Sequence, residues 1–267
     1  MSQDVVDLRS FYASRLGETA RRFVLRIVRE RWDNCAGMSV LGLGYATPYL
    51  DVFRREAMRT LAFMPAETGV VAWPPGERSA AALVETTALP LPDGCIDRLL
   101  LVHALEMEEH PRQLMAEIWR VLAPGGRVIV VAPNRRGLWA RFDTTPFGNG
   151  RPYSRGQLRA LLRESLFSPL SAGEALYMPP SSSGLVLRSA PMFERFGAGL
   201  GLPGAGVLAM EAAKQLYRPV AARRVVRQSV PQMQGALVPS GGRATAGEEA
   251  PPQPGRNASA RLTADAV

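Results

Sequence analysis

The chain has 267 residues, 46% of them hydrophobic, which suffices for one sizeable α/β domain, and no apolar run reaches the length of a membrane-spanning helix. The N-terminus lacks the pattern of a signal peptide, and Cys35 and Cys95 have no partner at metal-ligand spacing, so we expect a cytoplasmic protein in a reducing compartment with no bound metal. The net charge is +8, and all of the 32 basic residues except Lys214 are arginines. We attribute this arginine bias to genome composition and expect no nucleic-acid partner.

We predict an N-terminal amphipathic helix within residues 1–35. Apolar side chains between residues 4 and 32 recur at helical spacing, and arginines fill much of the opposite face. Three interpretations remain open. The helix packs on the domain, it forms a lid over a substrate pocket, or it is a basic membrane-surface helix.

Short apolar runs alternate with helical patterns from residue 38 to residue 132. This alternation predicts βαβ units and a mostly parallel sheet with helices on both faces, and ligands bind beyond the carboxyl ends of such strands. We expect helices at Pro48–Ala57 and Leu114–Leu122, and strands at Ser39–Leu43, Thr60–Met64, Ala81–Glu85, Arg98–Val102 and Gly126–Ala132.

The remaining chain is less regular. A loop over 133–153 precedes a serine-capped helix, Ser154–Glu164, and the Pro/Gly/Ser-rich stretch 178–206 surrounds a short segment, Pro191–Phe196. Residues 206–217 fit a last strand, although their alanines also suit a helix. Apolar periodicity disappears after residue 228, so we predict a domain over 36–228 and a disordered C-terminal tail over 229–267 that could contact a protein partner.

Three segments together carry a resemblance. They are "SVLGLGYATPYLD" (39–51), "ETTALPLPDGCIDRLLLVHALEMEEHP" (85–111) and "LMAEIWRVLAPGGRVIVVAPN" (114–134). The combination resembles class I S-adenosylmethionine-dependent methyltransferases of the small-molecule, type 11-like group. The resemblance implies a Rossmann-like seven-stranded sheet, mostly parallel with an antiparallel last strand. It also implies S-adenosylmethionine as cofactor and methyl transfer to a small-molecule substrate.

The cofactor motif departs from the family pattern. The family's first loop carries an acid and then three small residues at alternate positions. Here Gly42 takes the place of the acid, and the small positions fall on Gly44, Ala46 and Pro48. The family's second strand ends in an acid that bonds the ribose, whereas this one ends at Met64, with Glu67 three residues later. Loss of both acids predicts weakened cofactor binding.

The resemblance also assigns candidate site residues. Glu85 falls where the family has an acid near the adenine amino group, although a solvated strand-end glutamate is the alternative. His103 follows the fourth strand and is the candidate catalytic base, with a structural histidine as the alternative. The candidate cofactor-binding set is Gly42, Gly44, Ala46, Met64, Glu85, Thr86 and His103.

Polar and aromatic residues after the fifth predicted strand form the candidate substrate side. Adjacent arginines and a tryptophan there could recognise an anionic or aromatic substrate, whereas a solvated loop is the simpler interpretation. The candidate substrate-binding set is Asn134, Arg135, Arg136, Trp139 and Tyr153.

The sequence therefore favours a methyltransferase with an atypical cofactor site. The alternative is a non-catalytic interaction protein that keeps the methyltransferase fold but has lost the cofactor acids. A dinucleotide-dependent oxidoreductase fits less well, because Thr47 stands at the last glycine position of "GLGYAT" and no acid ends the second strand.

Overall fold

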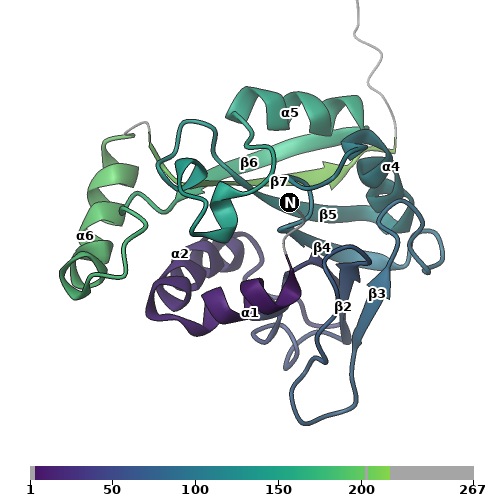
Figure 1. Cartoon of the computed structure of the whole chain (residues 1–267). Coiled ribbons are helices and arrows are strands. Elements are labelled where there is room, and N and C mark those ends of the chain that lie inside the picture. The colour runs from purple at the N-terminus through teal and green to yellow at the C-terminus, as the bar shows by residue number, and fades with distance from the viewer. Residues whose placement is uncertain (1–3, 202–203, 217–267) are drawn as a thin grey trace, which may run out of the picture. The chain divides into compact units, whose positions relative to one another are not determined.

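A seven-stranded sheet forms the centre of the computed structural model, which describes residues 4–201 and 204–216 (Figure 1). The strand order is β3-β2-β1-β4-β5-β7-β6, and β7 runs antiparallel to both of its neighbours, whereas all other neighbouring pairs are parallel. The expected Rossmann-like methyltransferase sheet is confirmed. The predicted tail, 229–267, lies outside the described residues. The strands are β1 (Ser39–Gly44), β2 (Arg59–Pro65), β3 (Ala81–Val84), β4 (Ile96–Val102), β5 (Leu122–Pro133), β6 (Phe167–Ala175) and β7 (Val207–Lys214).

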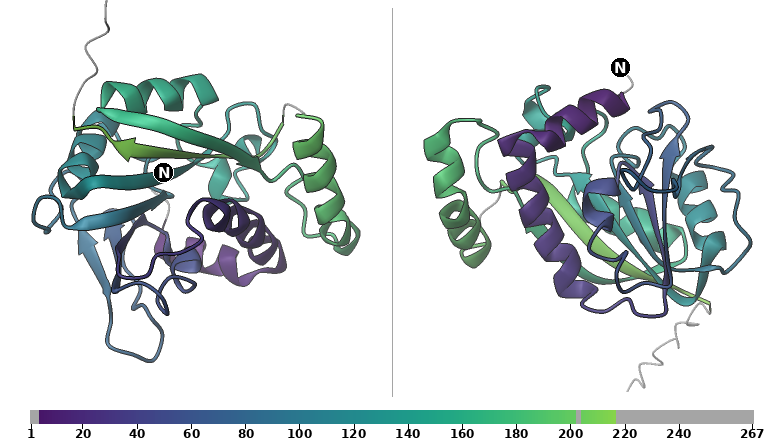
Figure 2. Two further views of the ribbon diagram at one scale, coloured as in Figure 1. Left: turned by 180° about the vertical axis from the view of Figure 1, so that it is seen from behind. Right: turned by 90° about the horizontal axis from the view of Figure 1, so that it is seen from below.

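Helices cover both faces of the sheet through two buried apolar clusters. One cluster joins one face to α1, α2 and α3, and the other joins the opposite face to α4 and α5. Figure 2 shows α1 and α2 on one side of the sheet and α4 on the other. The helices are α1 (Val5–Ala13), α2 (Arg15–Arg31), α3 (Thr47–Leu50), α4 (Pro111–Val121), α5 (Arg155–Glu164) and α6 (Gly184–Gly199), with short 3₁₀ helices η1 (Trp139–Arg141) and η2 (Pro146–Gly148).

The predicted single helix over residues 4–32 is in fact two helices. Ser14 ends α1 with an extended backbone, and its Oγ accepts a hydrogen bond of 3.0 Å from the Gly17 amide to cap α2. A Cβ on Gly17 would lie 1.9 Å from the Phe11 carbonyl oxygen, so the bend brings the two helices into backbone contact. The break lets α1 turn away from the direction of α2.

Other predicted elements need correction. The helix expected at Pro48–Ala57 is only the four-residue α3, followed by turns to Glu56. The segment Pro191–Phe196 belongs to a 16-residue helix, α6, which contains Pro191. Residues 206–217 hold a strand, β7. The edge strand β6 was not predicted, because Pro169 interrupts its pattern and coincides with a shift in its pairing with β7.

The backbone of the turn after β1 lies in close contact with the end of β4. Gly44 has φ of 83°, and a Cβ there would lie 2.1 Å from the Val102 carbonyl oxygen. That oxygen accepts a 2.8 Å hydrogen bond from the Tyr45 amide. Only glycine permits both this backbone conformation and this approach, so Gly44 fixes where the turn lies.

Replacing Gly44 by alanine is expected to destabilise the protein more than replacing Gly76. Both residues have positive φ, but a Cβ on Gly76 would meet nothing within 4 Å. Gly44→Ala should therefore lose about 1–3 kcal/mol of unfolding free energy beyond the loss in Gly76→Ala, because it adds overpacking to backbone strain. Urea unfolding measures both. Equal losses would contradict the close contact.

Candidate functional site

A cavity of about 430 Å³ opens where β2, β3 and β4 end at the carboxyl edge of the sheet. Its volume lies in the range of small-ligand sites. Two acids come directly after β2 and β3, and the segment after β4 closes the remaining side. The lining residues are Pro65, Ala66, Glu67, Thr68, Val84, Glu85, Thr86, Thr87, Ala104, Met107, Glu108, Glu109, His110 and Gln113.

Carboxylates and hydroxyls dominate the polar lining of this cavity. Thr86 Oγ1 donates to Glu108 Oε2 at 2.7 Å, and Thr87 Oγ1 donates to Glu85 Oε1 at 3.1 Å. The lining includes Glu67 as a further acid. Carboxylate oxygens accept hydrogen bonds from hydroxyl and amino groups. The cavity thus suits a ligand that presents such donors, as a nucleoside does.

A buried cluster of Tyr12, Tyr49, His103 and Glu106, here called the tyrosine–histidine cluster, lies where α1 crosses the ends of β1 and β4. The Tyr12 hydroxyl is 2.8 Å from the Tyr49 hydroxyl and 2.8 Å from His103 Nε2. His103 Nδ1 is 3.2 Å from Glu106 Oε1. The Tyr12 ring also stacks on Tyr45, with centroids 5.7 Å apart. One helix thereby connects the turn after β1 with the end of β4.

Burial sets the protonation of the two tyrosines. It raises the pKa of Tyr12 well above the ordinary tyrosine value, and the neighbouring Tyr49 raises it further. Burial also raises the pKa of Tyr49. Both hydroxyls therefore keep their protons at neutral pH.

The partners of His103 define its tautomer. We assign the tautomer in which His103 Nδ1–H donates a hydrogen bond to Glu106 Oε1, because a carboxylate can only accept, and this leaves Nε2 to accept from the Tyr12 hydroxyl. His103 also holds φ of 53°, which is strained for a non-glycine residue. Glu106 Oε2 is buried and has no hydrogen-bond partner within residues 4–201 and 204–216. The cluster thus presents a fixed imidazole acceptor and one unsatisfied carboxylate oxygen.

The site of the missing acid in the first loop is filled by apolar atoms. A Cβ on Gly42 would lie 2.7 Å from both Ala46 Cβ and Leu50 Cδ1. Ala46 is itself buried. An acid at position 42 does not fit this packing, so any polar contact of Gly42 or Ala46 with a ligand would come from the backbone.

Met64 does not face the cavity. Its side chain is fully buried in the apolar core, and the cavity is lined by the residues that follow it, Pro65, Ala66 and Glu67. The structure gives Met64 no contact with the cavity, and its role in binding the cofactor stays a prediction. Glu67 offers the carboxylate at the end of β2, whereas Glu85 and Thr86 line the cavity where the sequence placed them.

Two predicted substrate residues are buried and hydrogen-bonded to the backbone. Trp139 is fully buried, and its Nε1 donates to the Met178 carbonyl oxygen at 2.7 Å. Asn134 is buried, donates from Nδ2 to the Ala205 carbonyl oxygen at 2.8 Å, and accepts from the Arg136 amide at 3.2 Å. Asn134 also lines a cavity of about 360 Å³ together with Arg136, and the substrate roles of Asn134 and Trp139 stay predictions.

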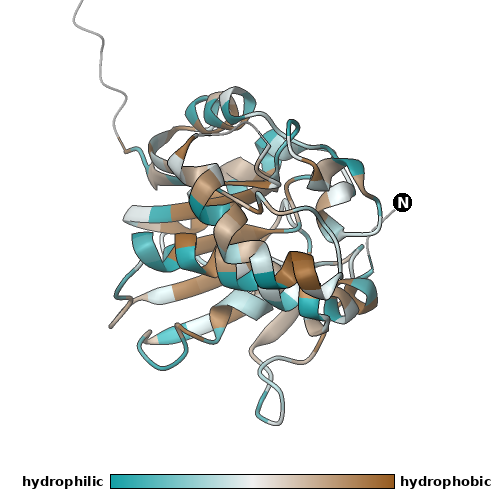
Figure 3. Cartoon of the chain, turned by 90° about the vertical axis from the view of Figure 1, so that its left-hand side faces the viewer, coloured by the Kyte–Doolittle hydropathy of each residue, from teal (hydrophilic) through white to brown (hydrophobic). Residues whose placement is uncertain are grey.

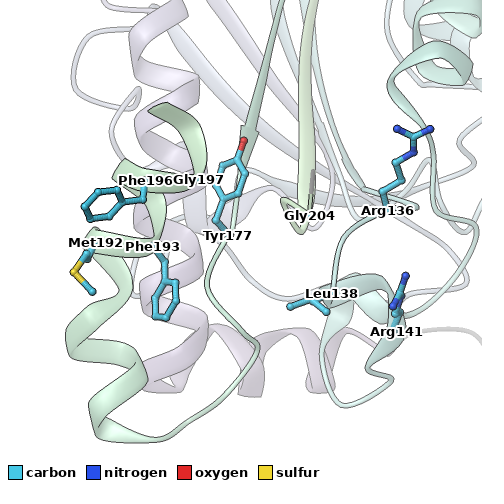
Figure 4. A pocket seen from close by; sticks show the side chains of 9 residues that line it. All are labelled: Arg136, Leu138, Arg141, Tyr177, Met192, Phe193, Phe196, Gly197 and Gly204. Carbon is cyan, nitrogen blue, oxygen red and sulfur yellow. The ribbon is translucent and has the colours of Figure 1, made fainter. Parts of the chain in front are cut away.

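The other predicted substrate residues do not converge. Arg136 lies with Arg141 beside a groove of about 490 Å³ between η1 and α6 (Figure 4). Arg135 is exposed, and its Nε donates to the Pro152 carbonyl oxygen at 3.4 Å. Tyr153 lines a different cavity beside α4 and α5, and burial raises its pKa. These residues do not form one substrate pocket.

Sequence reasoning missed three members of the tyrosine–histidine cluster. Glu106 carries a usable signal, because it stands three residues after His103 in "HALE". Tyr12 and Tyr49 carry none, since Tyr12 is 91 residues from His103 and reaches it only through the position of α1.

Comparisons with known proteins agree with this architecture. Residues 41–130 match the family described as a methyltransferase domain. A demethylmenaquinone methyltransferase of Thermus thermophilus is 25% identical over 163 residues, which are 58% of this chain and 67% of that enzyme.

Solved structures share the fold. A Thermotoga maritima SAM-dependent methyltransferase, described as a possible histamine N-methyltransferase, matches with a TM-score of 0.56 and 17% identity over 79% of this chain and 96% of its own. The [4+2]-cyclase SpnF matches with a TM-score of 0.55 and 22% identity over 75% and 83%. Residues 41–130 therefore match a methyltransferase domain family, and the sheet as a whole has the fold of class I S-adenosylmethionine-dependent methyltransferases.

Within 4–201 and 204–216 no helix has the length and apolar character needed to cross a membrane. The same ranges hold no group of three or more His, Cys, Asp or Glu side chains placed to bind a metal ion.

The buried tyrosines predict a loss of stability at alkaline pH. Because folding raises the pKa of Tyr12 and Tyr49, their contribution is complete below pH about 10 and is lost as the pH rises further. Each group adds up to about 1.4 kcal/mol per pH unit to the decline. Urea unfolding between pH 9 and pH 11 should therefore show a shallower decline for the Tyr12→Phe/Tyr49→Phe variant than for the unmodified chain. Parallel declines would contradict the assignment.

Proposed function

We propose that this chain is an S-adenosylmethionine-dependent methyltransferase that acts on a small molecule. The observation that carries the proposal is the cavity at the carboxyl ends of β2 and β3, lined by Glu67 and Glu85. Parallel α/β sheets bind their ligands at this edge. The match of residues 41–130 to the methyltransferase domain family supports the same placement.

The polar lining fits the adenosine end of the cofactor. Glu67 would accept hydrogen bonds from the ribose hydroxyls, and Glu85 would accept from the adenine amino group beside Thr86. Hydrogen bonds to an ionised carboxylate are stronger than neutral ones. Both carboxylates follow strand ends, so the sheet sets their positions. When bound, the cofactor supplies a methyl group on a positively charged sulfur that is already activated for transfer.

The methionine end would have to be held differently from the family pattern. No residue from Gly42 to Ala46 lines the cavity, and Tyr12 covers Tyr45 at the turn. We therefore infer that α1 acts as a lid, which moves off Tyr45 to admit the methionine end. Glu106 Oε2, which is buried and has no hydrogen-bond partner among the described residues, lies four residues after the end of β4.

His103 would act as the general base. His103 Nδ1–H donates a hydrogen bond to Glu106 Oε1. The Nε2 lone pair can therefore take a proton once the Tyr12 hydroxyl moves away. When an acceptor oxygen or nitrogen attacked the methyl carbon and the carbon–sulfur bond broke to leave S-adenosylhomocysteine, His103 Nε2 would take the acceptor's proton. Glu106 then neutralises the resulting imidazolium.

Titration with S-adenosylhomocysteine tests the cofactor site. Isothermal calorimetry should detect binding to the unmodified chain, and Glu67→Gln and Glu85→Gln should each weaken it by roughly 10-fold, since a carboxylate acceptor is lost. Glu30→Gln, on the exposed face of α2, is the matched control and should bind as the unmodified chain does. Absence of binding to the unmodified chain at about 1 mM ligand would refute the proposal.

A transfer assay tests the reaction. The similar Thermus enzyme is named for demethylmenaquinone, so that compound and a protein-free metabolite extract are the first acceptors to incubate with methyl-labelled S-adenosylmethionine. His103→Gln should lower the rate of label transfer about 10²–10⁴-fold. The same variant should leave affinity for S-adenosylhomocysteine unchanged. Full activity in the variant would eliminate His103 as the base.

A further inference from the structure

The outward face of α6 is apolar. Met192, Phe196 and Leu200 recur at the four-residue spacing of one helix face, and they are 54%, 60% and 69% exposed. Leu185 and Phe193, also exposed, extend this face. Figure 3 looks onto this side of the molecule, where hydrophobic residues recur along the helix.

The inward face of α6 is anchored, so the exposure of the outward face is not the result of a loose helix. Glu194 is buried, and its Oε1 accepts a 2.6 Å hydrogen bond from the Tyr177 amide. A Cβ on Gly197 would lie 2.2 Å from the Tyr177 ring, so helix and ring are in close contact. These contacts fix which residues of α6 face outward.

The groove between α6 and η1 continues this surface. Leu138 and Phe142, before and after η1, are 41% and 46% exposed. Figure 4 shows Leu138 and Arg141 across the groove from Phe193 of α6. We call the whole patch the α6 surface, defined by Leu138, Phe142, Leu185, Met192, Phe193, Phe196 and Leu200. Contiguous exposed apolar area of this kind marks an interaction site.

Arginines predominate among the charged side chains around the α6 surface. Arg136, Arg141, Arg188 and Arg195 are exposed, and none has an acidic partner among the described residues. The acids nearby are Glu194, which is buried, Glu174, which accepts from the Tyr177 hydroxyl, and the exposed Asp143 after Phe142. Guanidinium groups bind phosphate in a bidentate manner.

We propose that the α6 surface docks the chain on an anionic phospholipid bilayer. Met192, Phe196 and Leu200 would enter the boundary between headgroups and acyl chains, and the four arginines would contact lipid phosphates. The apolar helix face suits the acyl-chain layer of the bilayer, and the flanking arginines suit its anionic headgroup layer. A soluble acidic protein could also bind the four arginines. It would not explain why three large apolar side chains are exposed along one face of the helix.

Vesicle co-sedimentation with the full chain tests the proposal. Vesicles of phosphatidylcholine mixed with phosphatidylglycerol should bind the chain, and vesicles of phosphatidylcholine alone should bind it about 100-fold more weakly, because the arginines then lack anionic lipid. High salt should weaken binding to the mixed vesicles.

Matched variants locate the contact. Phe196→Glu and Met192→Glu should each reduce binding to the mixed vesicles by at least about 10-fold, because a charge then enters the apolar layer. Met58→Glu is the apolar control, since Met58 is 67% exposed and precedes β2 at the amino edge of the sheet. The double variant Arg188→Gln/Arg195→Gln should weaken binding to the mixed vesicles and reduce the effect of salt on that binding. Arg112→Gln, which removes a positive charge elsewhere, is the control for charge.

Three results would overturn the proposal. The first is no binding to the mixed vesicles at low salt. The second is binding that survives Phe196→Glu or is lost equally in Met58→Glu. The third is a dimer, seen by light scattering without vesicle binding, that Phe196→Glu dissociates, which would make the α6 surface an interface between two copies.

Discussion

The contact between Gly44 and the Val102 carbonyl oxygen is the constraint on which the site depends. It brings the turn after β1 within hydrogen-bonding distance of the end of β4, and a side chain on Gly44 would prevent this. Tyr45 and Tyr49 follow that turn, and His103 follows β4, so one close approach positions all three. Tyr12 of α1 then joins them through its ring and hydroxyl. The N-terminal helix therefore completes a site whose frame the sheet provides.

The loss of the acid in the first loop is a packing change and not an isolated substitution. Ala46 and Leu50 occupy the space into which a side chain at position 42 would project. Carboxylates instead follow β2 and β3, at Glu67 and Glu85, and both line the cavity. Recognition of a cofactor would accordingly rest on the strand ends. Glu106 adds a buried acid four residues after β4, with one oxygen unpartnered among the described residues.

The sequence predicted the sheet well because β4 and β5 end in continuous buried apolar runs, Leu99–Val102 and Val128–Pro133. Side-chain direction was harder to predict where a segment has no alternation of buried and exposed residues. Met64 lies in the part of β2 that is buried on both faces, so its side-chain direction could not be inferred. Trp139 begins the short helix η1, in a segment that the sequence indicated as a loop. The helix α6 was missed because its apolar face points outward and Pro191 interrupts it, and Tyr12 reaches His103 only in three dimensions.

The structure thus contains two distinct candidate sites. One is the carboxylate-lined cavity at the carboxyl edge of the sheet, and the other is the apolar, arginine-flanked surface on α6. The central claim is that the cavity holds the adenosine end of the cofactor despite the altered loop. A crystal structure with bound S-adenosylhomocysteine tests this claim most directly. The account predicts ribose hydroxyls within hydrogen-bonding distance of Glu67, the adenine beside Glu85 and Thr86, and Tyr12 moved away from Tyr45. Ligand bound elsewhere, with Glu67 and Glu85 both out of contact, would contradict it.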